Sequence, residues 1–140
     1  MTQDHFSSRF VLVDGQQGFV GETGTVTTVE QDGTFSVADF VNKVVEPPKR
    51  VGRLSPDAEG LLARALADAR LPELPNQIGE RVTANPRRLR VRYGTSDVTV
   101  VLPPDVDLDH WVPEELGGAD APTARVLRVW RVVHELLLTS

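Results

Sequence analysis

Short runs of apolar or alternating residues dominate the first third of the chain, a pattern typical of β-strands. An Asp32-Gly33 pair separates two of these runs, which predicts a hairpin. Pro47 and Pro48 follow the last run and forbid a continuing strand ladder there. The first 46 residues therefore predict an antiparallel meander. The candidate strands are residues 9–13, which end at Asp14-Gly15, then 23–30, 34–37 and 40–45.

Two segments show the helical period of apolar residues instead. The first covers residues 55–70, with Ser55 as the expected N-cap and Pro56 in the first helical position. Its predicted buried stripe contains Leu62, Leu66 and Ala69. The second helix is expected over residues 123–138, with a stripe formed by Val126, Trp130, Val133 and Leu137.

Between the helices, residues 89–93 and 98–102 predict a second hairpin. Leu89, Val91 and Tyr93 fall on one face of its first strand, and Arg88, Arg90 and Arg92 fall on the other. This alternation has two interpretations. The arginines lie on an ordinary half-exposed strand and pair with nearby carboxylates, which we favour, or they form an anion-binding patch.

These elements predict an α+β fold in which an antiparallel sheet of about five strands is covered by two amphipathic helices. The chain has 140 residues, 40% of them hydrophobic, which suits one globular domain. We therefore expect a single domain over residues 1–140, with a core between about residues 9 and 138.

The charge and composition argue against several classes of function. A formal net charge of -5 gives no electrostatic basis for binding nucleic acid. With no cysteine, the chain has neither disulfides nor thiolate catalysis. No targeting segment and no apolar run of membrane-spanning length is visible, so we expect a cytoplasmic protein without membrane contact.

Motifs for catalysis or cofactor binding are incomplete. His134-Glu135 begins a zincin-like HExxH motif, but Leu138 stands where the second histidine is required. The carboxylates of residues 105–109 resemble a calcium loop, yet His110 replaces its turn glycine. The glycine spacing fits no phosphate-binding loop. We therefore predict no catalytic residue, no metal site, no cofactor and no enzymatic activity.

One segment has a less ordinary composition. Phe19 and Val20 stand between Gly18 and Gly21 at an expected strand connection. The residues alone leave two interpretations open. Phe19 could fill the core at a tight turn, or the four residues could form an exposed recognition loop on a rigid sheet.

The order of several motifs resembles the emfourin family, typified by the protealysin inhibitor. The resemblance rests on residues 17–21 with the hairpin that follows, residues 52–56 and 67–75 around the first helix, residues 89–93, and the terminal helix, and it extends over about residues 10–138. It implies a small α+β, bacterial-type domain that inhibits a thermolysin-like zinc metallopeptidase. On this resemblance, Gly18, Phe19, Val20 and Gly21 would be the partner-binding residues and would occlude the active-site cleft. The alternative is a non-catalytic interaction subunit of a larger assembly with no protease target.

Overall fold

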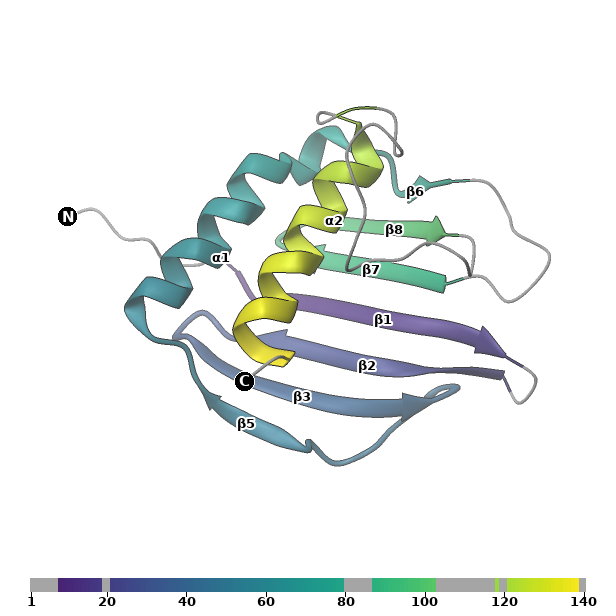
Figure 1. Ribbon diagram of the computed structural model, residues 1–140, viewed down its shortest axis with the longest axis horizontal. Helices are drawn as coiled ribbons and strands as arrows, with labels where there is room; N and C mark the ends of the chain where they lie inside the picture. Colours follow the sequence, from purple (N-terminus) through teal and green to yellow (C-terminus); the bar gives the residue numbers. More distant parts are fainter. Residues whose placement is uncertain (1–7, 19–20, 80–86, 103–117, 119–120, 139–140) are drawn as a thin grey trace.

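The computed structural model of the chain describes residues 8–18, 21–79, 87–102, 118 and 121–138. Its strands form one sheet, and both helices lie on the same face of that sheet (Figure 1). The elements in chain order are β1 (Phe10–Gly18), β2 (Gly21–Val29), β3 (Thr34–Val41), β4 (Val44–Val45), β5 (Arg50–Arg53), α1 (Pro56–Ala69), a 3₁₀ turn (Leu71–Glu73), β6 (Gln77–Ile78), β7 (Arg87–Tyr93), β8 (Ser96–Leu102), α2 (Pro122–Val133) and a π-helical turn (His134–Leu138).

The sheet confirms the α+β class, but the described residues form eight strands in it, so the expected number of about five was too low. The strand order is β4-β3-β2-β1-β7-β8-β6, and β5 also pairs with β3. All pairs are antiparallel except β6 with β8. The additional strands β4, β5 and β6 have only two to four residues each. Segments of this length show no period, which is why the sequence did not reveal them.

Strand β1 is longer than the sequence predicted. It does not end at Asp14-Gly15 but continues to Gly18. The reason is pairing on both sides, because Gly15 lies opposite Gly24 of β2 and opposite Arg88 of β7. Tertiary pairing therefore overrides the low strand propensity of these glycines. The outcome is a hairpin of two nine-residue strands whose outer sides are both paired.

The turns of the meander agree with the sequence in one case and differ in the other. The predicted hairpin at Asp32-Gly33 is confirmed, with Glu30 N donating to the Thr34 carbonyl at 2.8 Å. The expected continuous strand over residues 40–45 was wrong. Asn42 adopts a left-handed conformation (φ 55°) and separates β3 from β4.

Helix α1 begins as predicted, because the Ser55 side chain accepts a hydrogen bond from the Ala58 backbone N–H. Its C-terminal end is held from the other helix. The buried Arg125 of α2 donates from Nε to the Ala69 carbonyl at 2.8 Å and from Nη2 to the Arg70 carbonyl at 3.1 Å. The second helix starts close to the expected position, but its last turn is π-helical.

The core lies between the helices and the covered face of the sheet. The predicted stripe residues of both helices are buried there, which confirms the expected packing. On the opposite face, Arg90 of β7 pairs with Asp97, as the favoured interpretation of this strand predicted. Among the described residues, no helix is long and apolar enough to cross a membrane.

Candidate functional site

The predicted contact segment lies at one end of the sheet, where β1 turns into β2 (Figure 1). Gly18 and Gly21 are paired across the two strands and bound this connection. Gly21 has φ +112°, a conformation that L side chains rarely adopt, so glycine is required at this position. The other two predicted contact residues, Phe19 and Val20, lie outside the described residues.

A second hairpin ends beside the first. The backbone N–H of Asn42, in the β3–β4 turn, donates to the Glu22 carbonyl at 2.6 Å. In return, Glu22 N donates to Asn42 Oδ1 at 3.1 Å. A Cβ at Gly21 would collide with this same amide oxygen. The two turns are therefore coupled through Asn42, and each restricts the position of the other.

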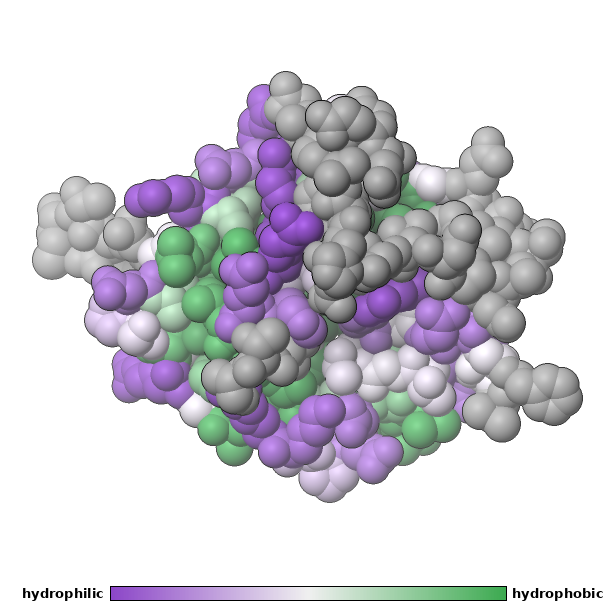
Figure 2. Space-filling view, in the orientation of Figure 1, coloured by the Kyte–Doolittle hydropathy of each residue, from purple (hydrophilic) through white to green (hydrophobic). Residues whose placement is uncertain are grey.

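The β3–β4 hairpin exposes three valines at this end. Val41, Val44 and Val45 have relative exposures of 43%, 68% and 57%, and they are three of the five large hydrophobic residues that are exposed in the described part of the chain. Figure 2 shows hydrophobic surface over the end of β3. We use the name "hairpin end" for the surface formed by Gly18, Gly21, Val41, Asn42, Val44 and Val45.

Sequence reasoning selected the two glycines of the hairpin end but missed its valines. The signal was an Asn42-Lys43 pair within a valine-rich run, since asparagine tolerates the left-handed conformation that a two-residue hairpin turn requires. Reading residues 40–45 as one strand concealed that turn. Exposed apolar residues gathered at one place are typical of a protein contact surface rather than of a catalytic centre.

The hairpin end extends from a firmly anchored part of β1. Arg87 of β7 binds Asp14 with two hydrogen bonds, from Nε to Oδ1 at 2.9 Å and from Nη2 to Oδ2 at 2.7 Å. The Trp130 indole N–H of α2 also donates to Asp14 Oδ2, at 3.0 Å. This cluster joins β1, β7 and α2 at a point four residues before Gly18.

Aromatic contacts complete the same cluster. The Arg87 guanidinium lies 5.8 Å from the Trp130 ring centroid, and the His134 ring stacks on Trp130 at 4.7 Å with an interplanar angle of 13°. The cluster therefore offers an ion pair and a stacked histidine, without a serine, threonine or cysteine nucleophile in these contacts. We assign it the role of fixing β1 against α2.

Titratable groups elsewhere on the sheet are held by a local ion pair or by hydrogen bonds. The hydrogen bond from Arg90 holds the pKa of Asp97 below its ordinary value of 3.8, and the same bond raises the pKa of Arg90. Hydrogen bonds from Thr34 lower the pKa of Asp32 in the β2–β3 turn. In the described ranges, three or more His, Asp or Glu side chains do not gather into a group that could hold a metal ion.

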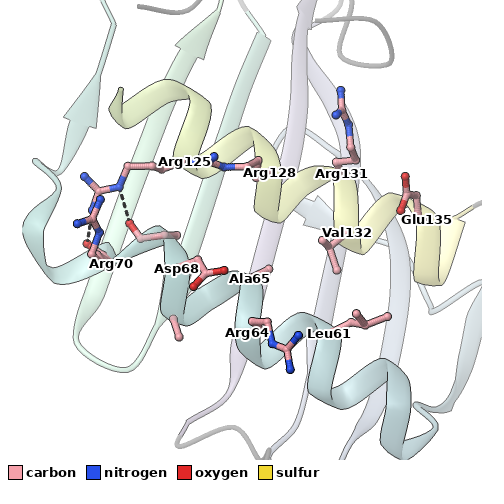
Figure 3. Close-up of a pocket in the computed structure, with 12 residues that line it drawn as sticks. Leu61, Arg64, Ala65, Asp68, Arg70, Arg125, Arg128, Arg131, Val132 and Glu135 are labelled. Atoms are coloured by element: carbon pink, nitrogen blue, oxygen red, sulfur yellow. Dashed lines mark hydrogen bonds between the residues drawn. The ribbon is translucent and has the colours of Figure 1, made fainter. Parts of the chain in front are cut away.

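A groove between α1 and α2 is a second surface of interest. It has a volume of about 830 Å³ and is lined by residues of both helices (Figure 3). Five of the twelve described residues that line it are arginines. It lies away from the hairpin end, on the side of the helices that faces away from the sheet.

Comparison with known proteins adds no assignment. No model of a known protein family matches the sequence, and no curated protein sequence matches it. The resemblance to the emfourin family therefore stays a prediction from the residues.

Proposed function

We propose that this chain is a non-catalytic protein that binds a thermolysin-like zinc metallopeptidase through its hairpin end and inhibits it by occluding the active-site cleft. The observation that supports the proposal is the coupling of two hairpin turns, one bounded by Gly18 and Gly21 and the other carrying exposed valines, at one end of the sheet. The motif order that resembles the emfourin family supports the choice of partner.

The mechanism needs a rigid surface rather than reacting groups. Both strands of the β1–β2 hairpin are paired on their outer sides, β1 as far as Gln16 and β2 from Thr23 onward. Asp14 is fixed by Arg87 and Trp130. A surface held in this way loses little conformational entropy on binding, which favours affinity. Val44 and Val45 would supply apolar area beside the β1–β2 turn, and the glycines would allow close approach of the partner's backbone.

The experiment that tests this proposal compares wild type with Phe19→Ala. Inhibition of a thermolysin-like peptidase from the same organism is titrated, and a thermal melt of each variant is recorded. If Phe19 contacts the peptidase, we expect an almost unchanged melting temperature and a loss of about 2 kcal/mol or more in binding free energy, roughly 30-fold in affinity.

Two outcomes would contradict the proposal in different ways. A lower melting temperature of Phe19→Ala with unchanged inhibition would assign Phe19 to the core and remove it from the contact surface. Wild-type protein that does not inhibit at high micromolar concentration would refute protease inhibition and favour the interaction-subunit alternative.

A further inference from the structure

We propose that the groove between α1 and α2 is a second protein-binding site, which takes an acidic amphipathic helix of a partner protein. This inference goes beyond the inhibition proposed above, because it uses a different surface and a different kind of partner. Three observations support it: the sign of the charge in the groove, the chemistry of its floor, and its shape.

The charge of the groove is opposite to that of the chain. The protein has a formal net charge of -5, with 15 basic and 20 acidic residues. Among the residues that the structure describes, the groove is nevertheless lined by five arginines and two carboxylates, Asp68 and Glu135. A third of all basic residues therefore line this one surface, and a groove concentrates their field toward an approaching anion.

Two of the five arginines, Arg70 and Arg125, make contacts at the C-terminal end of α1, so we assign the contacts with a ligand to the other three. Arg125 is buried and bonds to the carbonyls of Ala69 and Arg70, and both Arg125 and Arg70 lie within ion-pair distance of Glu73. The remaining cations are Arg64 on α1 and Arg128 and Arg131 on α2 (Figure 3). The inference rests on the positive potential that these groups create together, not on any one of them lacking a partner.

The kind of cation narrows the ligand. All basic residues of the groove are arginines, and none is lysine. The planar guanidinium group forms paired hydrogen bonds with carboxylates and phosphates, which a lysine ammonium does not. The ligand should therefore carry several planar or tetrahedral oxyanions.

The apolar residues at the floor of the groove favour a peptide over other polyanionic ligands. Ala65 and Val132 lie between the two helices (Figure 3), and Leu61 beside them has a relative exposure of 53%. Aliphatic side chains of a ligand would bury this surface, and the described lining of the groove holds no aromatic residue on which nucleic-acid bases could stack. Glutamate and aspartate combined with leucine at helical spacing supply both the charge and the apolar contact.

The length of the groove fits a short helix. Residues 61–70 of the α1 region line it, which corresponds to about 14 Å of helix. A partner helix of about three turns would cover this distance with apolar anchors at i, i+3, i+4 and i+7, the usual way in which an amphipathic helix occupies a groove.

The test uses a fluorescein-labelled peptide of about 12 residues, with Leu at those helical positions and Glu at most others. Its binding to the full chain is measured by fluorescence anisotropy. We expect saturable binding that weakens as salt increases. Arg128→Glu should weaken peptide binding at least about tenfold, with the largest loss at low salt. Leu61→Ser should also weaken peptide binding, but by a factor that does not change with salt.

Matched controls separate this site from general attraction. Arg92→Glu reverses an exposed charge on β7, on the opposite face of the sheet, and should leave the affinity within about twofold of wild type. A peptide of the same composition with shuffled order should bind more weakly.

Three results would overturn the inference. The first is equal affinity of Arg128→Glu and Arg92→Glu for the acidic peptide. The second is no binding of this peptide by wild type. The third is that wild type binds duplex DNA, or vesicles that contain phosphatidylserine, more tightly than it binds the peptide. None of these results depends on protease inhibition, so the two proposals fail separately.

Discussion

Trp130 should be the side chain on which both the fold and the position of β1 depend most. It is 4% exposed, its indole N–H donates to Asp14 Oδ2 at 3.0 Å, and Arg87 and His134 contact its ring system. Trp130→Ala removes a large buried aromatic side chain and leaves a cavity in the core. We therefore expect the free energy of unfolding to fall by about 3–5 kcal/mol.

A second variant separates packing from hydrogen bonding at the same position. Trp130→Phe keeps most of the apolar volume but removes the indole N–H from a partly buried carboxylate. Hydrogen bonds to charged groups contribute about 1.5–3 kcal/mol, and we expect a loss near the lower value because Arg87 still binds both oxygens of Asp14. Arg128→Ala, on the exposed side of the same helix, should change stability by less than about 0.5 kcal/mol.

Urea unfolding followed by far-ultraviolet circular dichroism measures all three variants, since this signal does not depend on tryptophan. From the most to the least stable variant, the expected order is Arg128→Ala, then Trp130→Phe, then Trp130→Ala. If the midpoints of Trp130→Ala and Arg128→Ala were equally close to wild type, α2 would not pack on the sheet through Trp130, and the reasoning about β1 would fail with it.

Two further predictions concern the sheet. Asp97→Asn should lower the thermal stability slightly at pH 7, because the pKa of Asp97 is lowered in the folded state. The stabilisation by the Asp97 carboxylate is complete only above its unfolded pKa of about 4, so the difference from wild type should shrink as the pH falls below that value. A constant difference in melting temperature at pH 3 and pH 7 would contradict this. Gly24→Ala should destabilise the fold by about 1–3 kcal/mol in urea unfolding, because its Cβ would collide with the Asp14 carbonyl of β1, whereas an unchanged midpoint would show that β1 and β2 separate without cost.

The sequence predicted those elements whose signals are local. The Ser55 cap of α1, the Asp32-Gly33 turn and the apolar stripe of α2 each depend on residues close together in the chain, and the structure has all three. Cap chemistry, turn conformation and helical period are properties of short segments. They do not depend on what the rest of the chain does.

The features that the sequence did not predict depend on partners distant in the chain. Strand β1 runs through Gly15 only because β2 and β7 pair with it on both sides. Strand β6 has two residues and pairs in parallel with β8. Arginine is usually a surface residue, so nothing in the sequence indicated that Arg125 is buried. Its role depends on the end of α1, whose Ala69 carbonyl accepts a hydrogen bond from it.

The candidate site was predicted in part for the same reason. Gly18 and Gly21 were visible as a glycine-bounded turn, whereas Val41, Val44 and Val45 are placed beside them by the β2–β3 ladder and by the bonds between Asn42 and Glu22. A pattern within one strand cannot show which other hairpin lies beside it. The anchor formed by Asp14, Arg87 and Trp130 was missed because its members are 43 to 116 residues apart in the chain.

The most direct test of the account is inhibition of a thermolysin-like peptidase by two valine variants of the same edge. Val44 in the hairpin end and Val51 on β5 are exposed by 68% and 72%, and both lie on strands that pair with β3. We predict that Val44→Asp raises the concentration needed for half inhibition at least about tenfold, while Val51→Asp leaves it within about twofold, at closely similar melting temperatures. Equal inhibition by both variants, or no inhibition by wild type, would contradict the claim that the hairpin end binds the peptidase.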